Sequence, residues 1–476
     1  MDNNNKFYID GQWVDATGEG RIEVINPATE EVIATVAKGG QEEVDAAVAA
    51  ARRAFDGWAA TPSAKRAELI GALAQKMGET MPEMGALISS EQGMPVHMAT
   101  MIQAGGPTLA MGKYAEMTSL MDKVEQSGTS VVYKEPIGVC AFITPWNYPL
   151  HQIVGKVAPA LAAGCTMVLK PSVETPLNAV RFTELLDEVG FPPGVFNLVN
   201  GSGSVVGEAL SAHSDVDMVS FTGSTWAGTR VAEVASKTVK RVTLELGGKS
   251  AFVITEDAPL AEAVQFGVQH VMSNCGQTCV ALTRMLVPES RYEEAVAIAK
   301  EFSESLKVGV PGDENSFMGP LVSKRQLEDV EGFIKKGVEE GARLVTGGDR
   351  PDDLDKGYYL KPTIFADVDN QMTIAQEEIF GPVLCLIPFK DEEDAVQIAN
   401  DTPYGLSGGV WAGDQAGAVK IAKRLRTGQV SINGGSFTYD APFGGYKTSG
   451  NGREWGEAGL DEYVELKAML MPAEAE

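Results

Sequence analysis

Cys279 has the surroundings best suited to nucleophilic chemistry in this 476-residue chain. It ends the run Gly276-Gln277-Thr278-Cys279, which follows apolar residues at helical spacing in residues 260–272. Glycine adopts backbone angles that other residues avoid, so we expect the helix to stop near Gly276. A thiol on such a turn, with its own backbone N–H free, could attack an electrophile and help to hold an oxyanion. The alternative is a small buried hydrophobic residue, which is what most free cysteines are.

Two polar residues elsewhere could assist such a thiol. Glu245 stands between two leucines, and burial there would raise its pKa and suit it to general-base work. A salt-bridged strand glutamate is the alternative. Asn147 lies between Pro145 and Pro149 in a stiff turn, where its amide could donate to a developing oxyanion or simply cap a helix.

Glycine-rich turns indicate a dinucleotide site. The spacing of Gly201, Gly203 and Gly207 is one residue longer than the Rossmann fingerprint. Residues 221–228 match better, because Ser224 or Thr225 can cap a helix whose N-terminus could hold a phosphate. Lys170 follows a predicted strand, at the edge where α/β sheets bind ligands. An ordinary βα loop and a solvated lysine are the respective alternatives.

Strand–helix alternation must position these residues. Predicted strands at 139–143, 166–169, 195–199, 218–221 and 242–246 alternate with helices, which is typical of a parallel α/β sheet. A second alternation follows Cys279. Before residue 139, the pattern predicts short strands in residues 7–36 and helices at 41–58, 63–90 and 98–121. Residues 127–134 resemble a strand.

Composition limits the class of protein. The chain is 44% hydrophobic and 22% charged, so we expect a globular protein of two or three domains. Five cysteines without a secretory segment favour a reducing, cytoplasmic location. A net charge of −26 argues against nucleic acid and anionic membranes, and the apolar run at 157–169 is too short to span a bilayer. None of the four histidines has ligand spacing with cysteines, so we expect no metal.

Six motifs in order resemble those of the NAD(P)-dependent aldehyde dehydrogenases. They are residues 145–147, 223–225, 245–248, 276–279, 377–382 and 442–454, and the resemblance covers essentially the whole chain. It implies an α/β fold with a Rossmann-type cofactor domain (1–120 and 137–247) and an α/β catalytic domain (248–450). A small β oligomerisation element would combine residues 121–136 and 451–476.

The resemblance also implies a mechanism, in which an aldehyde is oxidised to its acid through a thiohemiacetal and a thioester on Cys279. Asn147 would hold the oxyanion and Glu245 would activate water, while Lys156 and Glu454 match a proton path. Glu245 argues against the CoA-acylating branch. The implied cofactor contacts are Thr144, Trp146, Lys170, Ser172, Glu174, Gly203, Gly207, Phe221, Gly223, Ser224, Leu246, Gly247, Glu378 and Phe380.

The sequence departs from the family at the expected ribose contact. Val173 stands where relatives often have a glutamate, and Glu174 follows it. A carboxylate near the 2′-hydroxyl favours NAD and repels the phosphate of NADP. We therefore expect NAD, with NADP as an additional cofactor if Glu174 does not reach the ribose.

The expected substrate tunnel also departs from the family. Gln152 and Gly155 stand where relatives often carry larger apolar residues, and Phe437 and Phe443 should form aromatic walls. This predicts bulky hydrophobic or aromatic aldehydes, with a semialdehyde-specific enzyme as the alternative. Exposed strand edges favour a homodimer or homotetramer. If its stretch is helical, Cys275 shares a face with Cys279, which allows either a regulatory disulfide or a buried neighbour.

Overall fold

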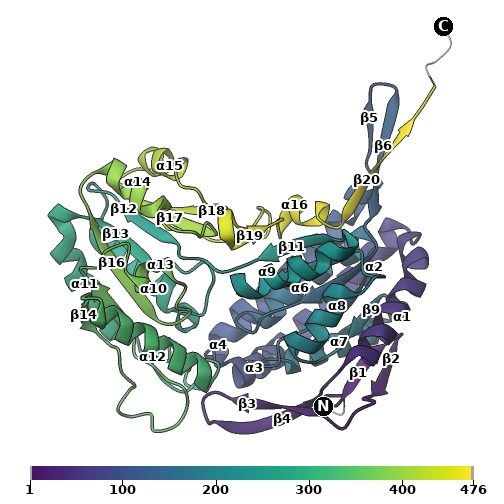
Figure 1. Cartoon of the computed structure of the whole chain (residues 1–476), viewed down its shortest axis with the longest axis horizontal. Coiled ribbons are helices and arrows are strands. Elements are labelled where there is room, and N and C mark those ends of the chain that lie inside the picture. Colours follow the sequence, from purple (N-terminus) through teal and green to yellow (C-terminus); the bar gives the residue numbers. More distant parts are fainter. Residues whose placement is uncertain (1–2, 473–476) are drawn as a thin grey trace.

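The computed structural model describes residues 3–472, so residues 473–476 of the predicted oligomerisation element lie outside the described part. The described chain forms two α/β units side by side, and a small antiparallel sheet projects from the first of them (Figure 1). No helix within residues 3–472 is both long and apolar enough to cross a membrane.

The first unit is built on an eight-stranded sheet with the order β19-β11-β10-β7-β8-β9-β1-β2. The five strands from β11 to β9 are parallel to one another, and β19, β1 and β2 join antiparallel at the edges. The strands are β1 (Lys6–Ile9), β2 (Gln12–Asp15), β7 (Val139–Ile143), β8 (Thr166–Lys170), β9 (Phe196–Leu198), β10 (Met218–Thr222), β11 (Arg241–Glu245) and β19 (Gly450–Asn451).

Helices cover both faces of this sheet. Along β7, Val139 and Ala141 face one core while Cys140 and Phe142 face the other, because successive side chains of a strand point to opposite faces. One face packs against α1 (Gln41–Ala59), α8 (Glu208–Ala212) and the end of α9 (Thr225–Ala235). The other packs against α2 (Ser63–Glu79), α3 (Met81–Gln92), α5 (Gly106–Met117), α6 (Pro149–Ala163) and α7 (Leu177–Val189).

Two segments that were expected to be single helices are each divided into shorter helices. The helix expected at 63–90 is divided into α2 and α3 at Thr80, because Pro82 in the first turn of α3 lacks an N–H and cannot continue a helix. The helix expected at 98–121 is divided as well, with Pro107 in the first turn of α5. Its pieces are α4 (Val96–Met98), a π-helical segment (Ala99–Gly105), α5 and a 3₁₀ segment (Thr118–Asp122).

The second unit contains a seven-stranded sheet with the order β14-β15-β16-β13-β12-β17-β18. Only β14 runs antiparallel to its neighbour. Its strands are β12 (Ala251–Ile254), β13 (Arg284–Pro288), β14 (Arg343–Thr346), β15 (Thr363–Ala366), β16 (Val383–Phe389), β17 (Ser407–Trp411) and β18 (Gln429–Ile432). Its helices are α10 (Leu260–Met272), α11 (Tyr292–Ser305), α12 (Lys324–Glu339), α13 (Thr373–Gln376), α14 (Glu392–Asn400) and α15 (Gln415–Ala422).

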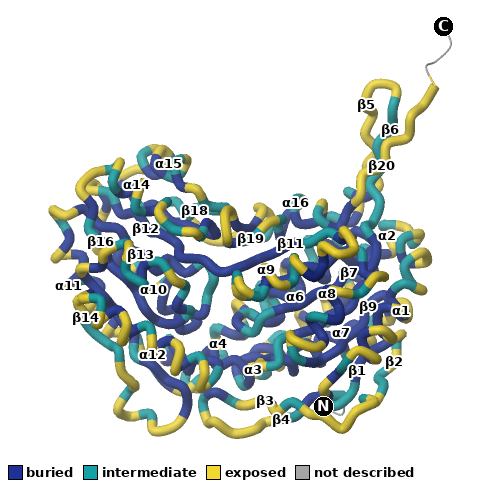
Figure 2. Tube along the Cα trace, in the orientation of Figure 1, coloured by how far each residue is buried: buried dark blue, intermediate teal, exposed yellow. Residues whose placement is uncertain are grey.

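Two small sheets complete the fold. The hairpin of β3 (Arg21–Asn26) and β4 (Glu31–Ala37) packs beside the first unit. In the projecting sheet, β20 (Val464–Leu470) pairs antiparallel with β6 (Ser130–Pro136), which pairs with β5 (Val124–Ser127). This sheet is largely exposed (Figure 2). The segment before β20 returns to the first unit, where α16 (Gly456–Asp461) contributes Leu460 to the core beside α6.

Candidate active site

Cys279 lies on an irregular loop that connects α10 to β13. After α10 the chain makes a 3₁₀ turn, in which Asn274 (φ 51°), Cys275 (φ 56°) and Gly276 (φ 69°) all adopt left-handed angles. A side chain at position 276 would clash with the backbone carbonyl of Gly381, which explains the glycine. The left-handed angles also mean that Cys275 and Cys279 do not share a helical face. All five cysteines are free, and the Cys275 thiol donates to the Gly319 carbonyl.

The Cys279 side chain opens into a cavity of about 630 Å³. The cavity lies between α6 and the second unit, and Thr278 and Val280 line it beside Cys279. None of the described residues that line the cavity is Asp, Glu, Lys or Arg. Burial, followed by the negative charges of Glu378 and Glu245, raises the pKa of the Cys279 thiol, so an isolated thiolate is disfavoured there.

Glu245 ends β11 inside the first unit, close to this thiol. The residue is buried, and neither carboxylate oxygen has a hydrogen-bond partner among the described residues. Burial and then the charge of Glu454 raise its pKa well above the usual range, whereas Lys156 lowers it. A carboxylate of this kind has a strong tendency to take up a proton.

Lys156 and Glu454 form a buried ion pair. The Lys156 ammonium also donates to the Thr222 hydroxyl at 2.7 Å. Glu454 comes from the segment that returns after β19, where its backbone bonds in both directions with Phe443 at 2.7 Å. The two residues that were predicted to form a proton path are therefore in direct contact, and both act on the pKa of Glu245.

Asn147 is held between the two units. Its side-chain amide donates to the Gln277 carbonyl at 3.1 Å, and Gln277 is two residues before Cys279. Its own backbone carbonyl accepts from the side chains of Asn274 at 3.0 Å and Gln103 at 3.2 Å. The fold thus brings the predicted oxyanion donor to the cysteine loop and leaves one of its amide hydrogens without a partner among the described residues.

Several predicted cofactor residues surround a cavity of about 370 Å³ at the carboxyl end of β7 and β10. Gly203, Gly207 and Phe221 line it, together with Trp226. The residues 203–207 form a π-helical turn that leads into α8. The Ser224 hydroxyl caps α9 by accepting from the Ala227 N–H at 3.3 Å. Of the two predicted caps, Ser224 and Thr225, Ser224 is the one that caps α9, and Gly223 precedes it directly.

The remaining cofactor candidates lie along the same edge. The Thr144 N–H donates to the Lys170 carbonyl at 3.1 Å, which aligns the ends of β7 and β8. Lys170 is buried, and burial lowers its pKa to about 8. Beyond it, Ser172 accepts from the backbone N–H of Glu174, whose side chain is exposed.

Glu378 reaches this edge from the second unit. It accepts from the Gly248 N–H at 2.8 Å, and a side chain at Gly247 would clash with its carboxylate. Burial raises its pKa to about 7. The Trp146 and Phe380 rings pack edge to face with centroids 5.3 Å apart, and Leu246 packs against α9.

The substrate-tunnel predictions have different outcomes. Gln152, Phe437 and Phe443 line the 630 Å³ cavity, but Gly155 does not. A Cβ atom at Gly155 would lie 3.0 Å from the Trp455 ring. The space that the glycine leaves is therefore occupied by Trp455, and does not widen the cavity.

Sequence reasoning missed several residues of this site. His151 and His270 line the cavity, and their Nδ1 atoms are buried without a hydrogen-bond partner among the described residues. Burial lowers the pKa of both imidazoles to about 4, so both are neutral at pH 7. The His151 ring packs on Tyr439 and Trp455. No spacing rule indicates such contacts, although Trp455 directly follows a motif residue.

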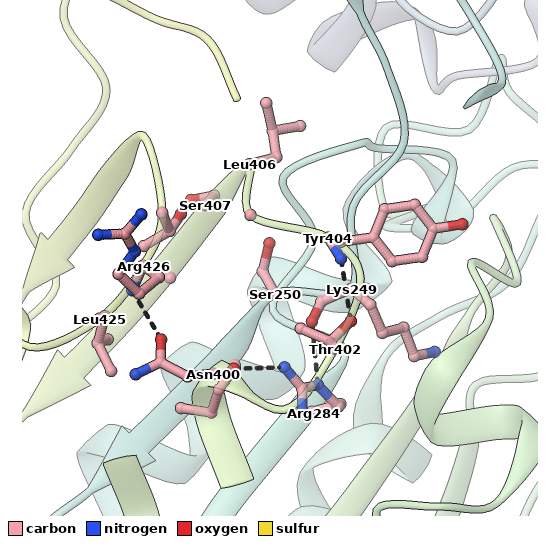
Figure 3. Close-up of a pocket in the computed structure, with 15 residues that line it drawn as sticks. Lys249, Ser250, Arg284, Asn400, Thr402, Tyr404, Leu406, Ser407, Leu425 and Arg426 are labelled. Atoms are coloured by element: carbon pink, nitrogen blue, oxygen red, sulfur yellow. Dashed lines mark hydrogen bonds between the residues drawn. The ribbon is translucent and has the colours of Figure 1, made fainter. Parts of the chain in front are cut away.

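A third cavity, of about 20 Å³, lies beside β17 (Figure 3). It has room for about one water molecule. The buried Arg284 lines it and donates to the Lys249 carbonyl at 3.0 Å and the Ala399 carbonyl at 2.9 Å. These bonds join the segment before β12 to β13 and α14, so the cavity belongs to the framework of the second unit.

A comparison with protein families agrees with this geometry. The model of the aldehyde dehydrogenase family matches residues 13–469. The chain belongs to this family.

Individual relatives support the same assignment. A 3-succinoylsemialdehyde-pyridine dehydrogenase of a Pseudomonas species is 52% identical over 475 residues, covering 99% of each chain. A cysteine mutant of aldehyde dehydrogenase C from Pseudomonas syringae, solved with NAD⁺ and octanal, is 47% identical with a TM-score of 0.98, covering 100% of this chain and 98% of that one. A Mycobacterium tuberculosis aldehyde dehydrogenase complexed with NAD⁺ is 45% identical with a TM-score of 0.97, covering 99% of each chain.

Proposed function

We propose that this protein oxidises bulky, uncharged aldehydes to carboxylic acids with NAD⁺, using Cys279 as the nucleophile. The observation that carries the proposal is the position of the Cys279 thiol, which opens into an uncharged 630 Å³ cavity with Asn147 and the unpaired Glu245 behind it.

The residues divide the chemistry as follows. The Cys279 thiol gives up its proton as its sulfur adds to the aldehyde carbon, and Glu245 is the nearby base with free oxygens. The alkoxide that forms accepts from the Asn147 amide and the Cys279 N–H. After oxidation, Glu245 takes a proton from water, whose oxygen attacks the thioester and releases the acid and the Cys279 sulfur. Lys156 and Glu454 pass the proton of Glu245 onward.

The cofactor edge fits a dinucleotide. The 370 Å³ cavity suits a planar base, the N-terminus of α9 suits a phosphate, and Glu378 and Lys170 present polar groups that suit the two riboses. NAD⁺, when bound, accepts the hydride from the substrate carbon. The NAD⁺ complexes of two similar enzymes support this choice. A Glu174 carboxylate that reaches the ribose would favour NAD over NADP, because its charge would repel a 2′-phosphate.

The cavity walls support the substrate class. Phe437, Phe443 and Tyr439 supply aromatic surface, and the neutral His151 and His270 can hydrogen-bond to an uncharged polar group. Without a cation in the wall, a substrate carboxylate would lose its water and gain no ion pair. A relative whose name places a pyridine ring in its semialdehyde substrate and another solved with octanal agree with this class.

We also propose a division of the chain and an assembly. Residues 1–120 and 137–247 would bind the cofactor and 248–450 would carry the nucleophile, in a cytoplasmic homodimer or homotetramer. The projecting sheet supports assembly, because Leu466, Met469 and Leu470 of β20 are exposed on a paired strand.

An absorbance assay of reduced nucleotide tests the function. Octanal, benzaldehyde and pyridine-3-carboxaldehyde should be oxidised with NAD⁺, and succinate semialdehyde should be much poorer. Cys279→Ala should abolish turnover, and Glu245→Gln should lower the steady-state rate about 10²–10⁴-fold, because both thiol deprotonation and thioester hydrolysis lose their base. A preference for succinate semialdehyde would contradict the substrate class, and turnover by Cys279→Ala would contradict the mechanism.

A further inference from the structure

A buried network of hydrogen-bonded side-chain amides extends from α3 to the cysteine loop. Gln92 is the last residue of α3, and its side-chain amide donates to the Asn274 Oδ1 at 2.8 Å. Gln92 Oε1 accepts from the Met94 N–H at 2.9 Å, so the orientation of this amide is determined. Gln92 is completely buried and Asn274 is 3% exposed.

Asn274 connects this hydrogen-bond network to Asn147. Its Nδ2 donates to the Asn147 carbonyl at 3.0 Å and to the Gln277 carbonyl at 3.2 Å. The Asn147 Nδ2 donates to the same Gln277 carbonyl at 3.1 Å. Gln103, from the π-helical segment, is a second donor to the Asn147 carbonyl at 3.2 Å.

The left-handed backbone of Asn274 makes this arrangement available. With φ 51° and ψ 31°, the residue turns its side chain back toward Asn147, while its own carbonyl accepts from both the backbone and the side chain of Gln277. Asparagine is among the few residues other than glycine that adopt this region readily. Gln277 Oε1 in turn accepts from the Val322 N–H at 2.9 Å, which anchors the loop to the second unit.

We propose that Asn274, held by Gln92, is a positioning residue that sets the oxyanion donor Asn147 relative to Cys279 across the boundary between the two units. The Asn147 backbone is fixed by donors from both units, and its side-chain amide is aligned by the Gln277 carbonyl. Since the oxyanion exists only during the reaction, an error in this alignment lowers kcat more than it raises KM. This inference rests on the proposed function, in which Asn147 is the oxyanion donor.

A double-mutant cycle tests the proposal. Asn274→Gly keeps a residue that tolerates the left-handed backbone and removes the amide. It should lower kcat about 10–100-fold with little change in the KM for NAD⁺. In an Asn147→Ala background, the same substitution should change kcat less than about threefold, because it acts through a group that is already absent.

Controls separate this role from general destabilisation. Asn197→Ala removes another fully buried amide, whose Nδ2 donates to the Met167 carbonyl at 3.1 Å and the Gly194 carbonyl at 2.9 Å. It should lower thermal stability and leave kcat unchanged. If Asn274→Gly does not fold, Gln92→Leu removes the support of Asn274 from the other side and should show the same cycle.

Each result has one meaning. An equal loss from Asn274→Gly in both backgrounds, or no loss at all, would overturn the positioning role. If Asn147→Ala alone retains full kcat, the oxyanion assignment of the proposed function fails, and it fails independently of Asn274.

Discussion

Lys156 and Glu454 are nearly 300 positions apart in the sequence and form an ion pair that is almost completely excluded from solvent. Their side chains are 0% and 6% exposed. The pair borders Glu245, whose pKa Glu454 raises and Lys156 lowers. The pair therefore leaves neither charge buried alone, and it adjusts the base of the reaction.

Removing one partner of this pair should be costly. Lys156→Met leaves the Glu454 charge buried and unpaired, and should lower the free energy of unfolding by about 3–5 kcal/mol. Lys156→Met combined with Glu454→Leu should recover most of that loss, because no charge remains buried. Urea unfolding at pH 7 measures both variants. A single-variant loss below about 1 kcal/mol would show that water reaches the pair.

The same pair should shift the pH dependence of thioester hydrolysis. Glu245 acts in its deprotonated form, so the hydrolysis rate rises as pH increases through its pKa. Glu454→Gln removes a negative charge and should lower that pKa, moving the rising limb to lower pH. Lys156→Met should move it to higher pH. Rapid-quench measurement of thioester decay between pH 5 and 9 locates the rising limb of the hydrolysis rate for each variant. Shifts in the same direction for the two variants would disprove this coupling.

Gly155 should tolerate no side chain without disturbing Trp455. In Gly155→Ala, the new methyl group would lie 3.0 Å from the Trp455 ring and 3.2 Å from the Glu454 Oε2, so we expect a loss of about 1–3 kcal/mol in stability and lower kcat. Gly112→Ala is the matched control, because nothing lies within 4 Å of the added group in α5. It should be neutral or slightly stabilising. Equal thermal stability of the two variants would contradict this packing.

His151 should make the protein sensitive to acid. Burial, followed by the charge of Lys156, lowers its pKa from 6.5 to about 4. The unfolded chain therefore takes up a proton first, and the free energy of unfolding falls as pH decreases from about 6.5 to about 4. His151→Asn should lose less stability between pH 7 and pH 4.5 than the unmodified protein, as measured by urea unfolding. His97→Asn, at an exposed position, should keep the original loss.

Much of this protein follows from local sequence. Alternating apolar strands and helices predict the parallel sheets, and the pair Ser224 and Thr225 predicts a capped start of α9, because these features depend on residues that are close in the chain. The motifs around Glu245 and Cys279 predict the aldehyde dehydrogenase family, which the comparison confirms. Local pattern failed where proline divides apparently continuous helices, as at Pro82 and Pro107.

Only the tertiary structure decided which distant residues meet. Trp455 fills the space at Gly155. Gln92 donates a hydrogen bond to Asn274, although the two residues are 182 positions apart in the sequence. The charges that shift the pKa of Glu245 belong to Glu454 and Lys156, which are far from it in the chain. Such contacts depend on how the two sheets and the returning segment 450–463 pack together. Close packing selects one arrangement of side chains that residue types and spacing alone leave open.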